Sequence, residues 1–306
     1  MVTPSPELQT LIAQSPFLEL TSSQQHYSHA KGDGVPLIRV CTPLCEAIIS
    51  LQGAQLLEFK THSGTPLLWL SPNCNFTEGT ALRGGVPICL PWFGPNAEDP
   101  SKPKHGFARN QPWELTRAYL ADSGEYELTF AFLSKANALF DYDFAAELKM
   151  VLGTSAKLQL SVTNLSERPF VCSWALHSYH PVTSLGGVRV EGLADRIYLD
   201  NLENHAPKRQ AGDLRFEGEV DRVYPAVDNL LTVADETPIE ISHHNCPSVI
   251  TWNPGPENAA KIADIGAGQE QHYICVERGA VLDEAWSMAP GETQCAWIEI
   301  NEVPSF

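Results

Sequence analysis

No uninterrupted apolar run in the sequence approaches the ~20 residues that cross a bilayer, and no charged-then-apolar leader stands at its start. Cations are also few, because 20 Lys and Arg face 37 Asp and Glu and give a formal net charge of −17. Such a field repels nucleic acid and anionic membranes, so we expect neither as a partner. These absences predict a soluble, cytoplasmic protein in which an anionic substrate needs Arg or Lys placed locally.

Signatures of several enzyme classes are also missing. The sequence contains no phosphate-cradling loop, dinucleotide fingerprint, zinc signature or nucleophile elbow. Its eight cysteines follow no repeating spacing, and the pair Cys41 and Cys45 has no second pair that would complete a zinc site. We therefore expect free thiols, mostly buried, and no metal.

Helical periodicity is weak outside ELQTLIA (7–13) and ENAAKIAD (257–264), whereas short apolar or alternating runs recur from end to end. Examples are EYELTFAF (125–132), KLQLSVTNL (157–165) and QCAWIEI (294–300). Many strands without alternating helices predict an all-β fold, a large antiparallel sandwich with few short helices. We expect one domain over residues 1–306, with residues 1–20 as a loosely held N-terminal arm.

Cationic side chains stand in two stretches rich in Gly and Pro, ALRGGVPICLPWFGP (81–95) and KHGFARNQPW (104–113). Arg83 precedes two glycines, which would let the backbone approach a ligand, and three prolines fix the path that follows. The second stretch carries His105 and Arg109. A rigid loop whose arginine caps a carbonyl fits Arg83 as well as a binding site does. A lone histidine such as His105 is more often structural than catalytic.

His177 follows an apolar run in FVCSWALHSYH (170–180). Strand alternation places it on the same face as Tyr179 and opposite His180, so the two histidines do not chelate one metal. On these residues alone, His177 is either a hydrogen-bonded core histidine or a catalytic one.

Acidic candidates are Glu277, which ends the apolar run HYICVE (272–277), and Asp221 in GEVDRVY (218–224). Burial raises the pKa of a carboxyl toward the range of a general base. The alternatives are a solvated Glu277, or one paired with Arg278, and an Asp221 in a turn paired with Arg222. Asp and Glu are so plentiful that no pair of them specifies a glycosidase.

Six motifs together resemble the aldose 1-epimerase superfamily, most closely its hexose-6-phosphate mutarotase (glucose-6-phosphate 1-epimerase) branch. In chain order they are LRGGVPICLPWFGP, KHGFARNQPW, ALHSYH, EVDRVY, TWNPGPENAAKIADIG and YICVERGAV. The run R-G-G-x-P-x-x-x-P-W-F-G-P followed by H-G-F-A-R is specific to this branch. The resemblance implies a β-supersandwich with the site on its concave face and no cofactor.

The resemblance also implies a role for each motif residue. His177 matches the family's catalytic acid and Glu277 its catalytic base. Substrate-binding roles fall to Arg83, Lys104, His105, Arg109 and Asp221. Lys104 replaces the usual Gln and would add a phosphate contact, and Ser178 and His180 replace the usual Thr and Phe. Arg278 replaces the usual Pro and would lower the pKa of Glu277 if its side chain turned inward.

The implied function is interconversion of the α and β anomers of a hexose 6-phosphate, above all glucose 6-phosphate, by a monomer. A base removes the proton of the C1 hydroxyl while an acid protonates the ring oxygen, the two being held on opposite edges of the hemiacetal. Arginines recognise the phosphate by paired, charge-assisted hydrogen bonds. Alternatives are a mutarotase of free aldoses such as galactose and a non-catalytic carbohydrate-binding module. A glycoside hydrolase would instead need two carboxylates flanking the scissile bond.

Overall fold

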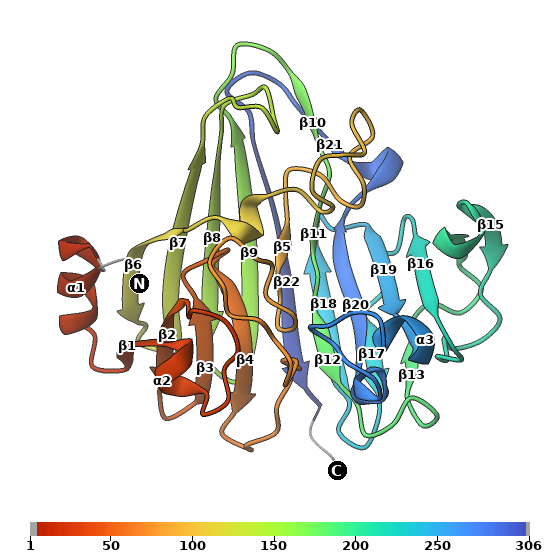
Figure 1. Cartoon of the computed structure of the whole chain (residues 1–306), viewed down its shortest axis with the longest axis horizontal. Helices are drawn as coiled ribbons and strands as arrows, with labels where there is room; N and C mark the ends of the chain where they lie inside the picture. Colours follow the sequence, from red (N-terminus) through yellow and green to blue (C-terminus); the bar gives the residue numbers. More distant parts are fainter. Residues whose placement is uncertain (1–4, 304–306) are drawn as a thin grey trace.

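The computed structural model describes residues 5–303, and Figure 1 shows that they form a predominantly β structure. The 22 strands of this part of the chain are antiparallel within four sheets. The predicted all-β sandwich is confirmed. None of the helices within residues 5–303 is long and apolar enough to span a membrane.

Sheet I is four-stranded and lies at the N-terminal end of the chain. Its order is β1 (Leu18–Ser22), β2 (Pro36–Cys41), β3 (Cys45–Ser50) and β4 (Gln55–Thr61).

Sheet II contains the longest strands. Its order is β13 (Arg189–Glu191), β17 (Leu231–Ala234), β18 (Ile239–His244), β22 (Thr293–Glu302), β9 (Ser155–Asn164), β8 (Phe144–Leu152), β7 (Tyr126–Ser134) and β6 (Glu114–Leu120). In β7 and β9 every second side chain is buried, as the alternating runs at 125–132 and 157–165 predicted.

Sheet III is made of shorter strands. Its order is β15 (Ala206–Arg209), β14 (Ile197–Asp200), β16 (Val220–Tyr224), β19 (Ser248–Asn253), β20 (Tyr273–Ala280), β11 (Trp174–Leu176) and β5 (Ile88–Cys89), with β12 (Tyr179–Pro181) also paired to β20. All eight residues of β20 are buried, so this strand is covered on both faces. The small fourth sheet pairs β10 (Phe170–Cys172) with β21 (Trp286–Met288).

Helices are short, as expected. They are α1 (Pro6–Ala13), α2 (Ser23–His26) and α3 (Gly255–Ala259), with four 3₁₀ turns, η1 (Ala108–Asn110), η2 (Asn201–Glu203), η3 (Gln269–His272) and η4 (Leu282–Glu284). The run ELQTLIA lies in α1, whose Ser5 cap accepts the Leu8 N–H at 3.1 Å. The run ENAAKIAD is helical only to Ala259, because the chain then turns through Gly266 and Gly268, both at positive φ.

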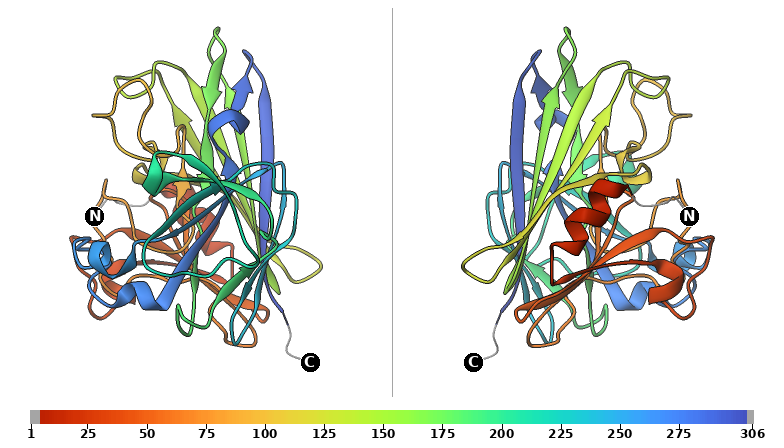
Figure 2. Two further views of the ribbon diagram at one scale, coloured as in Figure 1. Left: turned by 90° about the vertical axis from the view of Figure 1, so that its right-hand side faces the viewer. Right: turned by 90° about the vertical axis from the view of Figure 1, so that its left-hand side faces the viewer.

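One cluster of buried apolar side chains joins the three larger sheets; it contains Ile49 of sheet I, Leu148 of sheet II and Ile274 of sheet III. Of the expected N-terminal arm, residues 1–4 lie outside the described residues, whereas Leu8 and Leu18 are buried against this cluster. In side view, the long strands of sheet II lie on one side of the molecule and the loops of residues 81–110 on the other (Figure 2). Within these residues β5 pairs with β11, which joins the loops to sheet III.

Candidate active site

The two glycines after Arg83 bring two backbone segments of the protein together. Gly84 and Gly85 have φ of 122° and 61°, which L side chains rarely adopt. A Cβ atom on Gly84 would lie 2.5 Å from the Trp69 carbonyl, and one on Gly85 would lie 2.1 Å from the Leu56 carbonyl. The expectation that these glycines admit a ligand is therefore corrected, since the backbone that they approach is that of the protein.

Sheet III carries the candidate side chains on one face. Asp221 of β16 stands opposite Trp252 of β19, which stands opposite Cys275 of β20. Glu277 lies two residues beyond Cys275 and so projects from the same face. Strand register thus gathers residues from three segments into a cross-strand row.

His177 lies between β11 and β12, where its N–H donates to the Pro87 carbonyl at 3.0 Å. Its ring stacks on Tyr179, with centroids 4.8 Å apart and planes at 12°, and meets Trp252 edge-on at 6.1 Å. His180 points elsewhere, to the Leu67 carbonyl at 3.2 Å and the Ser178 hydroxyl at 3.0 Å. The predicted separation of the two histidines is confirmed.

His177 and Glu277 meet in this row. Nε2 of His177 is 3.4 Å from Oε1 of Glu277, and the two side chains are only 8% and 1% exposed. Nδ1 of His177 and Oε2 of Glu277 have no hydrogen-bond partner among the described residues. A buried polar atom without a partner is costly, so both atoms are suited to a ligand hydroxyl.

Burial displaces the pKa values of this pair in opposite directions. The pKa of Glu277 is raised well above its ordinary value by burial and then by Asp221, with Arg109 acting against them. The pKa of His177 is lowered well below its ordinary value by burial, and then by the charges of His105, Arg109 and Arg83. Between these two pKa values the pair holds a single proton, which belongs to the pair and not to one residue.

The separation of 3.4 Å corrects the expected arrangement of acid and base. No sugar ring fits between groups so close, so they cannot stand on opposite edges of a hemiacetal. The C1 hydroxyl oxygen and the ring oxygen are bonded to the same carbon and are themselves neighbours. A close acid–base pair can therefore exchange protons with the C1 hydroxyl oxygen and the ring oxygen from the same side of the sugar.

Arg278 does not turn toward Glu277, because consecutive strand residues project to opposite faces. Its guanidinium is buried and donates to the carbonyls of Val227, at 2.6 Å, and Asn229. Burial lowers the pKa of Arg278 to about 10. The alternative of a pair between Arg278 and Glu277 is therefore wrong, and the condition under which Arg278 would lower the pKa of Glu277 is not met.

Asp221 is a strand residue, not a turn residue. Its Oδ1 accepts a hydrogen bond of 2.7 Å from Nδ2 of Asn201, and burial raises its pKa. Arg222 turns away to Gln210 at 2.9 Å, so the expected pair of Asp221 with Arg222 is wrong. No sequence pattern pointed to Asn201, whose place beside Asp221 depends on the pairing of β14 with β16.

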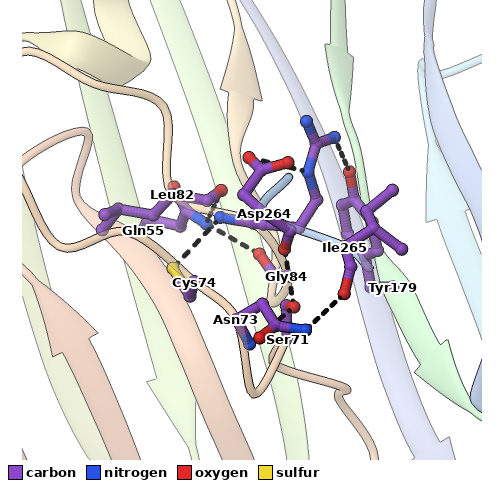
Figure 3. Close-up of polar contacts among 10 residues, drawn as sticks. Gln55, Ser71, Asn73, Cys74, Leu82, Gly84, Tyr179, Asp264 and Ile265 are labelled. Atoms are coloured by element: carbon purple, nitrogen blue, oxygen red, sulfur yellow. Dashed lines mark hydrogen bonds and ion pairs between the residues drawn. The ribbon is translucent and has the colours of Figure 1, made fainter. Parts of the chain in front are cut away.

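Arg83 lies at the side of this row and is already engaged. Its Nε donates to Oδ2 of Asp264 at 3.2 Å and its Nη1 to the Tyr179 hydroxyl at 3.0 Å (Figure 3). Arg83 and Asp264 are both 24% exposed. The sequence did not single out Asp264, which is 181 residues away along the chain.

Arg109 differs from Arg83, because no carboxylate within residues 5–303 forms an ion pair with it. Its Nη2 donates to the Lys104 carbonyl at 3.1 Å, and its buried Nε has no partner there. Lys104 is exposed at the rim. This loop therefore offers two cations to an anionic ligand.

His105 holds the same loop next to the acid–base pair. Its Nδ1 accepts the Gly94 N–H at 3.2 Å, so a neutral ring carries its proton on Nε2. Its ring centroid lies 5.9 Å from that of His177. Burial, and then the charge of Arg109, lowers the pKa of His105 to about 3, which favours the neutral ring.

Metal ligands are not grouped in the described part of the chain: no three His, Cys, Asp or Glu side chains there are placed to hold one ion. The chemistry that the arrangement supports is proton exchange between a carboxyl and an imidazole. The cations beside it are suited to holding a negative charge.

Comparison with known proteins gives consistent matches. The model of the family "Aldose 1-epimerase" matches residues 36–301. A Salmonella typhimurium protein named "Putative glucose-6-phosphate 1-epimerase" is 36% identical over 80% of this chain and 83% of its own. An Escherichia coli protein of the same name is 35% identical over 82% and 85%. The crystal structure of "a putative mutarotase (YeaD)" from Salmonella typhimurium has a TM-score of 0.82 at 32% identity, covering 89% of this chain and 91% of that one. The chain belongs to the aldose 1-epimerase family.

Proposed function

We propose that this protein interconverts the α and β anomers of a hexose 6-phosphate, with glucose 6-phosphate as its substrate. The observation that carries the proposal is the buried pair of His177 and Glu277, 3.4 Å apart, each with an unpartnered polar atom. The names of the relatives support the reaction and the sugar phosphate.

In the proposed reaction the pair acts in its ion-pair form. The Glu277 carboxylate takes the proton of the C1 hydroxyl while protonated His177 gives its proton to the ring oxygen. The bond between C1 and the ring oxygen breaks, and the C1 carbonyl forms. After rotation about C1–C2 the ring closes on the other face. Glu277 gives its proton back to the C1 oxygen while His177 takes the proton of the C5 hydroxyl, so the pair returns to its starting form and no atom is gained or lost.

The displaced pKa values suit this exchange. With one proton on the pair, the neutral form (Glu277 protonated, His177 neutral) and the ion-pair form differ only in the position of that proton. Burial favours the neutral form, so the ion pair is a reactive minority whose base is strong and whose acid is strong. Asp221, which raises the pKa of Glu277, strengthens the base and is placed to accept a sugar hydroxyl.

The phosphate is assigned to the loop of residues 104–109. Arg109 has no carboxylate partner among the described residues, and Lys104 is exposed beside it. We assign Nε2–H of His105 as a donor to the sugar, because its Nδ1 already accepts the Gly94 N–H. Arg83 reaches the phosphate only with the part of its guanidinium that Asp264 and Tyr179 leave free.

A second candidate function is mutarotation of a free aldose such as galactose. It is favoured by one observation, the ion pair of Arg83 with Asp264, which removes part of the cationic charge from the phosphate. In that case Lys104 and Arg109 would contribute little to catalysis.

The test is one-dimensional NMR or polarimetry on freshly dissolved α-glucose 6-phosphate, α-glucose and α-galactose. We expect wild type to accelerate anomer exchange of glucose 6-phosphate most, and His177→Ala to return it to the buffer rate. Equal acceleration of all three sugars would favour the second candidate. No acceleration of any sugar would leave only a non-catalytic carbohydrate-binding module.

We also propose that the chain works as a single domain and a monomer in the cytoplasm. The main core contains residues of all three larger sheets, which supports a single domain. The eight cysteines are free and six of them are buried, which is typical of a reducing compartment.

A further inference from the structure

A chain of contacts connects Asp264 to His177. Asp264 accepts from Nε of Arg83 at 3.2 Å, and Nη1 of the same guanidinium donates to the Tyr179 hydroxyl at 3.0 Å. The Tyr179 ring stacks on His177 with centroids 4.8 Å apart. Each link fixes the next group, because a planar guanidinium held at two nitrogens has little freedom left.

The backbone on both sides of Arg83 is clamped, as Figure 3 shows. The buried Gln55 amide donates to the carbonyls of Leu82, at 3.2 Å, and Gly84, at 2.7 Å. The Arg83 N–H points to the Cys74 sulfur at 3.3 Å. The Arg83 guanidinium therefore reaches Tyr179 from a backbone segment that is held in place.

The segment that carries Asp264 is fixed by the loop of residues 71–74. The Ser71 hydroxyl donates to the Asp264 carbonyl at 2.6 Å, and the Asn73 amide donates to the Ile265 carbonyl at 2.7 Å (Figure 3). The same loop accepts the Arg83 N–H at Cys74. Both partners of the ion pair thus share one support, which exposed ion pairs lack.

Within the chain of contacts from Asp264 through Arg83, it is Tyr179 that touches His177, the proposed acid. Its ring lies within an aromatic cluster, 5.4 Å from Tyr273 and 6.0 Å from Trp69 between centroids. Its hydroxyl is held by Arg83 and stays protonated, because burial raises its pKa. The Asp264 carboxylate forms an ion pair with Arg83, and through this contact its effect would reach Tyr179 and His177.

We propose that Asp264 is a positioning residue for the anomer exchange, acting through Arg83 and Tyr179 on the orientation of His177. The inference rests on the proposed function. It gives Arg83 a role different from that of Arg109: Arg83 connects the sugar-phosphate end of the site to the proton-transfer end. Removing the Asp264 charge then frees Arg83 for the phosphate while it loosens His177, so KM and kcat should respond differently.

The experiment compares kcat and KM of wild type, Asp264→Asn and Asp264→Glu for glucose 6-phosphate and glucose. We expect Asp264→Asn to lower kcat about tenfold on both sugars with KM for glucose 6-phosphate unchanged or lower, and Asp264→Glu to restore part of kcat. The matched control is Asp141→Asn, which removes an exposed ion pair to Arg168 and should change neither constant. An unchanged kcat, or a higher KM with unchanged kcat, would overturn the proposal.

A double-variant cycle tests the route. Tyr179→Phe removes the hydroxyl that Arg83 holds but keeps the stacked ring, so it should reproduce part of the loss in kcat. Combining it with Asp264→Asn should add little to the larger single effect, since both changes cut one chain of contacts. Effects that multiply fully would show that Asp264 does not act through Tyr179.

A substrate-free readout separates failure of this inference from failure of the proposed function. In Asp264→Asn the charge of Arg83 loses its counterion beside His177, so the pKa of His177 measured by NMR should fall further and its ring signals should shift. Besides Arg83, the charged and titratable groups facing His177 are Glu277, His105, Arg109 and Tyr179, and the substitution leaves their identities intact. A wild type without activity would refute the proposed function, whereas unchanged His177 signals in the variant would refute the positioning role.

Discussion

The two ends of the candidate site differ in how far their charged groups are buried. The proton-transfer end is the pair His177 and Glu277, and the proposed phosphate end is Lys104 and Arg109. At the proton-transfer end, His177 and Glu277 are almost fully buried and their pKa values move toward the neutral forms. At the phosphate end, Lys104 is exposed and Arg109 has no carboxylate partner among the described residues. Burial makes a proton easy to exchange, and exposure keeps a cation available to an anion in a chain of net charge −17.

The difference follows from where each end sits in the fold. The proton-transfer pair stands on sheet III, where β20 is covered on both faces and desolvates its side chains. Lys104 and Arg109 stand on a loop outside the sheets. Close backbone contacts at Gly106 and the buried Phe107 and Ala108 fix this loop, while Lys104 itself stays exposed. A mutation at one end should therefore change a different kinetic constant from a mutation at the other.

The largest expected effect is at the proton-transfer end. Glu277→Gln keeps the shape of the side chain but removes the base, so kcat for anomer exchange should fall by roughly 10²–10⁴-fold. The loss should be the same for glucose 6-phosphate and glucose, because both present the same hemiacetal. NMR exchange rates at saturating sugar measure it, and a change confined to KM would contradict the assignment.

The next effect is at the phosphate end. Arg109→Ala should raise KM for glucose 6-phosphate about 10- to 100-fold and leave glucose unchanged, because it removes charge-assisted hydrogen bonds to phosphate. Arg117→Ala is the matched control, since this exposed arginine stacks on Tyr119 of sheet II. Equal changes for both sugars would place Arg109 on the sugar and not on the phosphate.

The pH profile of kcat should report on the proton-transfer pair, His177 and Glu277, for both sugars. The pair works with one proton, so kcat should fall as pH drops through the lowered pKa of His177, where a second proton binds. It should also fall as pH rises through the raised pKa of Glu277, where the last proton leaves. The expected result is a broad plateau across neutral pH for both sugars. A narrow optimum at about pH 5.4, midway between the ordinary pKa values of about 4.3 and 6.5, would contradict it.

The smallest effects concern the rim. Lys104→Ala should raise KM for glucose 6-phosphate only a few-fold, because an exposed cation contributes about 0–1 kcal/mol. Added salt should raise the same KM and leave kcat unchanged, since the Debye length falls from about 10 Å at 0.1 M to about 3 Å at 1 M. Initial rates at several salt concentrations check both points; a salt-dependent kcat would mean that exposed charges reach the proton-transfer step.

The strands and the main candidate residues could be predicted from the sequence because they depend on local patterns. The alternating apolar and polar residues of EYELTFAF and KLQLSVTNL are alternately buried and exposed in the structure. The same strand alternation correctly predicted that His177 and His180 point to different sides. Motif resemblance singled out His177 and Glu277 together, which spacing alone could not do across 100 residues.

What the sequence did not reveal depends on register and on contacts between loops. Asn201 reaches Asp221 only because β14 pairs with β16, and Asp264 reaches Arg83 only because the loop of residues 71–74 holds both. The purpose of Gly84 was misjudged for the same reason, since its close neighbour is the backbone at Trp69. The roles of Asn201, Asp264 and Gly84 depend on distances between residues far apart in the chain, which the sequence alone does not provide.

The central claim is that His177 and Glu277 act as one unit on two neighbouring oxygens. The most direct test is a double-mutant cycle of anomer exchange on glucose 6-phosphate, measured by NMR for His177→Ala, Glu277→Gln and the combined variant. Groups that act as a unit give non-additive losses, so the combined variant should be no slower than the slower single variant. Losses that multiply would show two independent contributions and contradict the claim.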